Sequence, residues 1–308
     1  MMGDKCVPDG RGIIHSPILS VGFLILGFLS GCSSFGERYH RDDVVLARQI
    51  ARQGADAFHS GDWTQAEQCY AKAVDACPVD ERVRARYAET LWKQRRYEEA
   101  IKHQEEAVRL SGGAAELEIR LSQMYLSRGD LHRAEDLIER AIRSGRESAL
   151  AHHVQGDILE RQGNWRGALA AFHRALSIQP HYPEVRMAVA RVYLREGRAQ
   201  RALATLQSLA STYPPGEKPA DLAYWQALAF ASLGRHSEAV RHFEIAESRG
   251  LQSADLLYRL AHSHYLAGEI TAAHGVLQRA MHMAPNHPQA TRLCELIRHG
   301  NRMARVRK

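Results

Sequence analysis

The sequence predicts an all-α fold, and three observations support this prediction. Hydrophobic residues make up 45% of the chain and charged residues 25%, as in an ordinary soluble helical protein. Alanine, arginine, leucine, glutamate and glutamine dominate the composition, and these residue types favour helices over sheets. A single residue pattern also returns every 34 positions. Pairs of short helices, each stacked on the next pair, explain these observations together.

The repeated pattern is clearest in its first copy. There Gly61 and Trp63 are followed by Ala66, Tyr70 and Ala73. The last three positions recur as Ala100, Gln104 and Ala107; Ala134, Ile138 and Ala141; Ala168, Phe172 and Ala175; Ala202, Leu206 and Leu209; Ala239, Phe243 and Ala246; and Ala273, Leu277 and Ala280. Three residues are inserted within 215–219, after which the frame resumes. The spacing predicts a helix, a turn and a second helix in every copy.

Small residues mark the first helix of every copy and the turn that follows it. The eighth position holds Gly54, Ala88, Ser122, Gly156, Ala190, Ala227 and Ala261. A small side chain there allows the paired helices to approach closely. The turn position holds glycine, which tolerates the left-handed conformation that ends a helix. Arg95 occupies this position in the second copy, so we expect backbone strain there. Pro78, Pro180 and Pro285 are placed to stop the second helix.

This combination of spacing and residue types resembles the tetratricopeptide-repeat family over residues 47–287. The resemblance implies a right-handed superhelical solenoid, in which each unit buries its apolar face against its neighbours. The expected units are 47–80, 81–114, 115–148, 149–182, 183–219, 220–253 and 254–287.

The remaining segment, 288–308, is predicted to be a capping helix followed by a basic tail. Leu293, Leu296 and Ile297 lie on one face of a helix over 288–299, which would seal the last repeat. The eleven residues 298–308 carry five basic side chains and no acidic one. We expect a disordered, solvated end there, with contact to anionic lipid or nucleic acid as the alternative.

The net charge of +6 therefore comes mostly from the tail. The repeat region is close to neutral, so the sequence offers no basic face for nucleic acid, and a nucleic-acid partner is not expected.

The N-terminal segment resembles a bacterial export signal. Residues 18–29 are uncharged but too short to span a bilayer, which needs about 20 residues. They match the apolar part of a secretory signal peptide, although Asp4 and Asp9 offset the basic residues before it. The sequence Leu-Ser-Gly-Cys that ends at Cys32 resembles the lipobox of bacterial lipoproteins.

That resemblance implies cleavage before Cys32 and attachment of lipid to its sulfur and its new amino group. Several acyl chains anchor a protein stably, at about 0.8 kcal/mol per buried CH₂. We therefore expect 1–31 to be removed and 32–46 to form the lipidated cysteine and a tether. The expected location is extracytoplasmic and membrane-anchored, on the outer-membrane side in a Gram-negative host. An uncleaved anchor and an ordinary secretory signal are the alternatives.

The family resemblance also implies a concave peptide-binding groove, lined by positions 2, 5, 9, 12 and 13 of the first helices. Aromatic side chains at an interface supply large contact area at low entropic cost. The candidate groove residues are Phe58, Trp92, Arg191, Arg195, Tyr224, Tyr258, His262 and Tyr265. The alternative is that the aromatic side chains pack against adjacent helices. Ala51 and Ala55 occupy the positions where chaperone-tail-binding relatives carry their carboxylate clamp, so that ligand is not expected.

The sequence offers little that could support catalysis or metal binding. His152 and His153 are adjacent, and His262 and His264 are two apart, whereas two ligands on one helix face need a spacing of four. No phosphate-binding loop or nucleophile motif is present. Cys69 and Cys77 would lie about 12 Å apart along a helix, beyond the reach of a disulfide. We expect no enzyme activity, cofactor or metal.

The sequence thus predicts a membrane-anchored scaffold that binds protein or peptide partners during cell-envelope assembly. Lipid-anchored tetratricopeptide-repeat proteins include assembly factors of type IV pili and a class that organises cell-wall enzymes, and the resemblance does not select one. The alternatives are an accessory or regulatory subunit of an enzyme complex, such as a glycosyltransferase or cell-wall enzyme partner, and a cytoplasmic scaffold.

Overall fold

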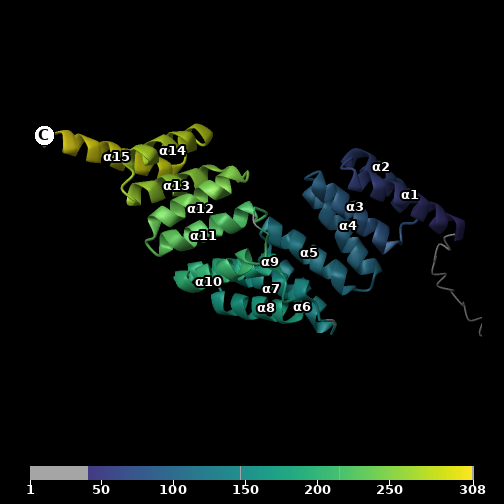
Figure 1. The fold of residues 1–308 in the computed structure, drawn as a ribbon. Helices are drawn as coiled ribbons and strands as arrows, with labels where there is room; N and C mark the ends of the chain where they lie inside the picture. Colours follow the sequence, from purple (N-terminus) through teal and green to yellow (C-terminus); the bar gives the residue numbers. More distant parts are fainter. Residues whose placement is uncertain (1–40, 146, 215, 307–308) are drawn as a thin grey trace, which may run out of the picture. The chain divides into compact units, whose positions relative to one another are not determined.

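A computed structural model describes residues 41–145, 147–214 and 216–306, and its secondary structure in those ranges is entirely helical (Figure 1). The helices are short, and consecutive helices pack side by side in chain order. They are α1 (Arg41–His59), α2 (Trp63–Ala76), α3 (Glu81–Lys93), α4 (Tyr97–Leu110), α5 (Ala115–Arg128), α6 (Leu131–Arg143), α7 (Ala149–Arg161), α8 (Trp165–Ile178), α9 (Pro183–Arg195), α10 (Ala199–Ala210), α11 (Ala220–Ser232), α12 (His236–Ser248), α13 (Ala254–Leu266), α14 (Ile270–Met283) and α15 (Pro288–Val306).

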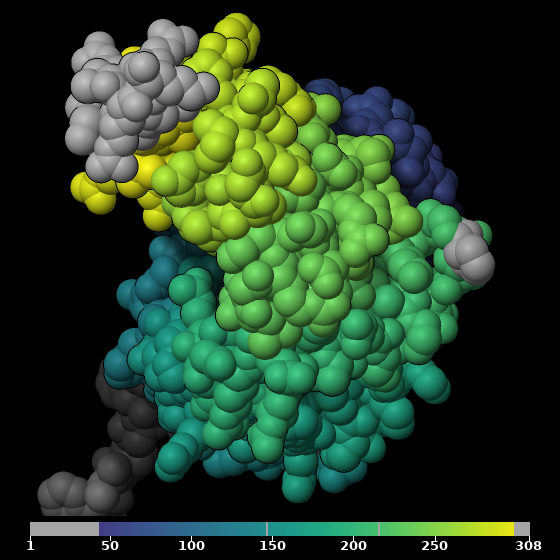
Figure 2. All heavy atoms as spheres, turned by 60° about the vertical axis from the view of Figure 1, so that its left-hand side comes forward, coloured from purple at the N-terminus to yellow at the C-terminus, as the bar shows by residue number. Residues whose placement is uncertain are grey.

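The first fourteen helices form seven helix-turn-helix pairs, and each pair packs against the next. From the second pair onward, the first helix begins at the first residue of an expected unit, at 81, 115, 149, 183, 220 and 254. The prediction of an all-α solenoid is confirmed. In the space-filling view the sequence colours also follow one another from teal to yellow, as expected when each unit contacts mainly its neighbours (Figure 2).

The structure corrects the sequence prediction at both ends of the repeat region. The tether was expected to run to residue 46, but α1 already begins at Arg41. Asp43 lies in the first turn, where a negative charge is favourable, and the helix runs on into the completely buried Ala47. The expectation of a disordered end from residue 298 is also wrong, because α15 continues to Val306. Burial of Leu293 and Ile297 fixes its first half, and the helix-favouring residues Arg302, Met303, Ala304 and Arg305 follow the weaker helix formers Gly300 and Asn301.

The segment 1–40 lies outside the described residues, and with it the predicted signal peptide and Cys32. No helix in the described part of the chain has the length and apolar character needed to cross a membrane.

The recurring small residues pack at the contact between paired helices. The repeated alanine of the second helix has no exposed surface in any pair: Ala66, Ala100, Ala134, Ala168, Ala202, Ala239 and Ala273. Of the two pairs with glycine at the eighth position of the first helix, the fourth has the closer contact, because a Cβ atom added to Gly156 would lie 2.3 Å from the Phe172 ring. At Gly54 the nearest ring atoms, those of Tyr70, would lie 3.2 Å away. Glycine at 156 is therefore a packing requirement.

The turn after α3 confirms the expected strain. Arg95 has a φ of 64°, and it is the one non-glycine residue with positive φ among the described residues. The same turn position in the fourth pair is Gly163, with a φ of 79°. A residue with a Cβ atom adopts this conformation at a cost that glycine avoids.

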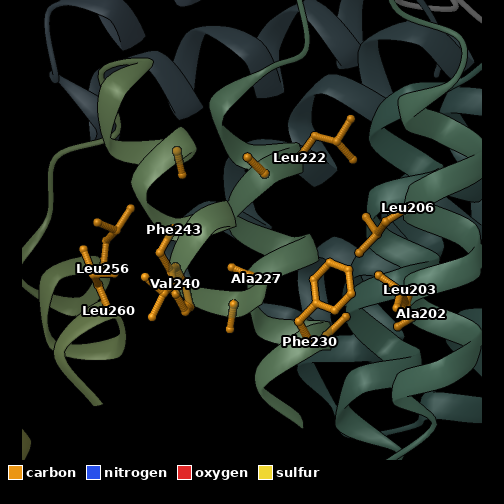
Figure 3. Close-up of a cluster of buried hydrophobic side chains, with 14 of the residues drawn as sticks. Ala202, Leu203, Leu206, Leu222, Ala227, Phe230, Val240, Phe243, Leu256 and Leu260 are labelled. Carbon is orange, nitrogen blue, oxygen red and sulfur yellow. The ribbon is translucent and has the colours of Figure 1, made fainter. Parts of the chain in front are cut away.

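The largest core cluster shows how the pairs are joined. Leu206 of α10, Phe230 of α11, Phe243 of α12 and Leu256 of α13 belong to one continuous set of buried side chains (Figure 3). A core shared by successive helices means that no pair buries its apolar surface alone. Cys69, Cys77 and Cys294 are free thiols.

Candidate peptide-binding face

The first helices of the seven pairs contribute one candidate binding face, which we call the first-helix face. Its residues lie on α1, α3, α5, α7, α9, α11 and α13. Polar contacts join neighbouring first helices at four places. They are Arg120 Nη1 to Glu89 Oε2 at 3.5 Å, Arg161 Nη1 to the Leu126 carbonyl at 3.4 Å, Arg191 Nη2 to Glu160 Oε2 at 2.5 Å, and the Tyr224 hydroxyl to Asp255 Oδ2 at 2.8 Å.

Three cavities open between these helices. The α1–α3 cavity has a volume of about 500 Å³, the α3–α5 cavity about 390 Å³, and the α7–α9 cavity about 490 Å³. The first is lined by Arg48, Ala51, Arg52, Ala55, Tyr70, Asp80, Glu81, Arg82, Val83 and Arg86. The second is lined by Ala85, Glu89, Trp92, Gln104, Arg120, Gln123, Met124 and Ser127. The third is lined by Leu126, Asp157, Glu160, Arg161, Trp165, Arg191 and Arg195. Trp92, Arg191 and Arg195, predicted from sequence, thus lie in cavity walls.

The α7–α9 cavity is built around a cluster of ion pairs. Arg191 bonds to both Glu160 and Asp157, with Nη2 2.5 Å and 3.2 Å from their oxygens. Burial alone would lower the pKa of Arg191, but its bonds to Glu160 and the charge of Asp157 outweigh burial and raise it. Burial also raises the pKa of Asp157, against the opposing charges of His153 and Arg191. This guanidinium is therefore neutralised internally, whereas Arg195 is exposed at the cavity wall.

His153 adjoins this cluster without joining a metal site. Its Nδ1 lies 3.0 Å from the Tyr182 hydroxyl and its Nε2 lies 3.4 Å from Asp157 Oδ2. Burial lowers the pKa of His153, so the ring favours its neutral form more than an exposed histidine does. Within the described ranges, no group of three or more His, Cys, Asp and Glu residues is arranged to hold a metal ion.

The early aromatic candidates are held by other rings. Phe58 packs edge-on against Trp63, with 4.9 Å between ring centroids. Trp92 packs edge-on against Tyr97 at 4.7 Å. Trp92 still lines the α3–α5 cavity, so this contact fixes the indole as a rigid wall.

The late aromatic candidates also contact their neighbours. Burial, together with the hydrogen bond to Asp255, raises the pKa of Tyr224 to about 12. Tyr258 stacks on His262 with 5.9 Å between ring centroids. Tyr258 and Tyr265 pack against the core beneath α15. The late positions thus combine internal packing with a partly exposed surface, and their role in binding a partner stays a prediction.

Two features of the site were missed by sequence reasoning. Arg191 of α9 forms an ion pair with Glu160 of α7, in the preceding repeat, and no sequence motif predicts this pair. Gln104 lines a cavity, although its position belongs to the apolar core in the other repeats. The sequence could have indicated Gln104, because every other repeat has an aromatic or aliphatic residue at that position.

Comparisons with known proteins agree with this architecture. A family model described as tetratricopeptide repeat matches residues 52–115, 119–183 and 224–290, and a second model with the same description matches 159–229. The chain is 34% identical over 92 residues to cellulose synthase operon protein C of Pseudomonas fluorescens (strain SBW25). That match covers 30% of the chain and only 7% of the relative's length.

Solved structures resemble the chain in fold. A tetratricopeptide repeat protein from Parabacteroides merdae ATCC 43184 has a TM-score of 0.65 at 16% identity, over 82% of this chain and 99% of that one. Pseudomonas aeruginosa pilF has a TM-score of 0.60 at 13% identity, over 70% of this chain and 96% of that one. At these identities the likeness concerns the fold alone.

Proposed function

The chain belongs to the tetratricopeptide-repeat family, and on this basis we propose that it is a non-enzymatic scaffold that binds peptide segments of partner proteins along the first-helix face. The observation that carries the proposal is the presence of three cavities between the first helices, two of them next to tryptophan side chains. The α3–α5 cavity combines apolar walls with a few polar groups, the usual composition of a binding site, whereas charged side chains dominate the lining of the other two cavities. Because the α1–α3 and α3–α5 cavities belong to successive repeats, an extended peptide fits this face better than a compact ligand does.

The proposal includes a lipid anchor at Cys32 and a role in cell-envelope assembly. It rests on the apolar segment 18–29 and on the lipobox-like residues that end at Cys32. In a bacterial host, Cys32→Ala should move the protein from the membrane fraction to the soluble fraction. Unchanged fractionation of the variant would contradict the anchor and leave the binding proposal intact.

One observation favours a second role, as an accessory subunit of a polysaccharide-synthesising complex. The curated relative's name places it in a cellulose synthase operon, and 92 residues of this chain match it at 34% identity. The match is short, so a scaffold without a fixed pathway remains the first proposal.

Peptide selection tests the binding proposal directly. Phage-displayed random short peptides are selected on the full chain, and the enriched peptides are titrated against two variants. Arg195→Glu reverses a charge in the α7–α9 cavity wall, whereas Arg174→Glu makes the same change at an exposed position on α8, outside the cavities. We expect some of the enriched peptides to lose affinity for Arg195→Glu and to keep it for Arg174→Glu. Equal binding to both variants by every peptide, or no enrichment, would contradict the proposal.

A further inference from the structure

The residue at position 104 breaks the repeat pattern inside the core. The same position holds Tyr70, Ile138, Phe172, Leu206, Phe243 and Leu277 in the other repeats. All of these side chains are buried and mainly apolar, and Gln104 also has no exposed surface. A polar amide has therefore been placed where the fold otherwise uses an apolar side chain.

One atom of this amide has no partner. Gln104 Nε2 donates a hydrogen bond to the Leu117 carbonyl at 3.0 Å. A carbonyl only accepts, so the nitrogen must face Leu117. The other amide atom, Oε1, is buried without a hydrogen-bond partner. An unpaired buried acceptor destabilises the folded chain, and an apolar side chain at this position would avoid that cost.

Gln104 also lines the α3–α5 cavity. The cavity has donors at its rim, on Arg120 and Gln123, and the Trp92 indole in its wall, whereas the Ser127 hydroxyl already donates to the Met124 carbonyl at 2.8 Å. The one carboxylate in its lining, Glu89, already accepts from Arg86 at 2.9 Å. The cavity thus presents an unpaired acceptor from the core side, donors from the rim, and no free negative charge.

We propose that the α3–α5 cavity binds a neutral carboxamide side chain, asparagine or glutamine, of the partner peptide. Its NH₂ group donates to Gln104 Oε1, and its carbonyl accepts from the donors at the rim. Because Gln104 has no exposed surface in the peptide-free chain, the wall must shift slightly, and the unbranched Met124 side chain is suited to this movement. The inference rests on the proposed function, since it names the side chain that the first-helix face selects.

Other side chains fit this cavity less well. A carboxylate would place acceptor against acceptor at Gln104 Oε1. A cationic side chain would have to compete with Arg86 and Arg120 for Glu89. An aliphatic side chain would leave Oε1 unpaired and desolvated. A carboxamide carries both a donor and an acceptor, and it satisfies both sides of the cavity.

The test uses the same displayed random peptides and compares the wild-type chain with Gln104→Leu. Leucine restores the apolar pattern, so this variant should unfold at the same or a higher denaturant concentration than the wild type. Gln94→Leu is the matched control. Gln94 also donates through Nε2 to a backbone carbonyl, that of Trp63 at 3.0 Å, but it does not line the cavity.

We expect asparagine or glutamine to be enriched at one peptide position on the wild type and on Gln94→Leu, and not on Gln104→Leu. A selected peptide should bind Gln104→Leu about tenfold more weakly, as expected for one lost hydrogen bond. Replacing its glutamine by methionine should weaken wild-type binding equally and leave binding to Gln104→Leu unchanged.

Two other outcomes separate the inference from the proposed function. Enrichment of peptides without an amide preference, still sensitive to Arg195→Glu, would overturn the inference and keep the function; Oε1 would then be satisfied by water. Failure to enrich any peptide would overturn both.

Discussion

The second and fourth repeats fill the same position in opposite ways. In the fourth, α7 and α8 enclose the Phe172 ring against Gly156, with no room for even one methyl group. In the second, the Gln104 amide is buried at the position equivalent to Phe172 and leaves one acceptor unpaired beside a cavity. The turns differ too, because the fourth repeat has Gly163 where the second has Arg95.

The difference separates residues that follow the repeat from residues that depart from it. Following the pattern gives close packing and an unstrained turn, and both contribute to stability. The departures in the second repeat cost stability, and Gln104 adds polar chemistry to the first-helix face. A solenoid tolerates such local costs because each unit gains stability from its neighbours.

Removing the aromatic ring from the fourth repeat should have the largest effect. Phe172→Ala leaves a cavity at a completely buried site, and we expect it to lower the free energy of unfolding by about 4 kcal/mol. Urea denaturation followed by circular dichroism measures this change. Ala170→Ser, at an exposed position of the same helix, is the control and should change the free energy little. A loss below about 1 kcal/mol would mean that the Phe172 ring is not closely packed in the fourth repeat.

The converse change tests the close contact itself. Gly156→Ala places a methyl group against the Phe172 ring, and we expect a loss of about 2 kcal/mol from overpacking. The sixth repeat carries Ala227 and Phe243 at the same positions, and both are completely buried. An alanine and a phenylalanine can therefore face each other in this fold, and the clash arises from the closer approach of α7 and α8 in the fourth repeat. Combining Gly156→Ala with Phe172→Leu should recover part of the loss. Strict additivity of the two changes in denaturation would show that they do not act through this contact.

The ion pairs of the α7–α9 cavity give the fourth repeat a pH dependence. Arg191→Met leaves Asp157 and Glu160 without their cation, and we expect a loss of about 2 kcal/mol at pH 7, since the cluster is only partly buried. The loss should shrink as the pH falls, because protonation of Asp157 removes its unpaired charge. Asp157 already has a raised pKa, so its ionisation costs stability as pH rises above about 4. Denaturation of both proteins from pH 7 to pH 4.5 measures this, and a pH-independent difference would contradict it.

Much of the fold could be predicted from the sequence, because its packing rule is periodic. The positions of Ala168 and Gly156 hold small residues in every repeat, and the burial of these positions follows from helix geometry. The site was less predictable. The bond of Arg191 to Glu160 depends on the angle between α7 and α9, which the repeat pattern does not encode. Whether Tyr224 faces a partner or Asp255 depends on the same geometry. The role of Cys32 stays a prediction from its neighbours in sequence.

The smallest expected effect is a gain, and it concerns the turn of the second repeat. Arg95→Gly relieves the positive φ of 64° but increases the freedom of the unfolded chain. The two contributions partly cancel, so we expect stabilisation of about 0.5 kcal/mol. Arg95→Ala keeps the strain and should give no gain, which separates backbone relief from loss of the arginine charge. If the alanine variant gained as much as the glycine variant, charge would be the cause, and the turns of the second and fourth repeats would differ in sequence without differing in strain.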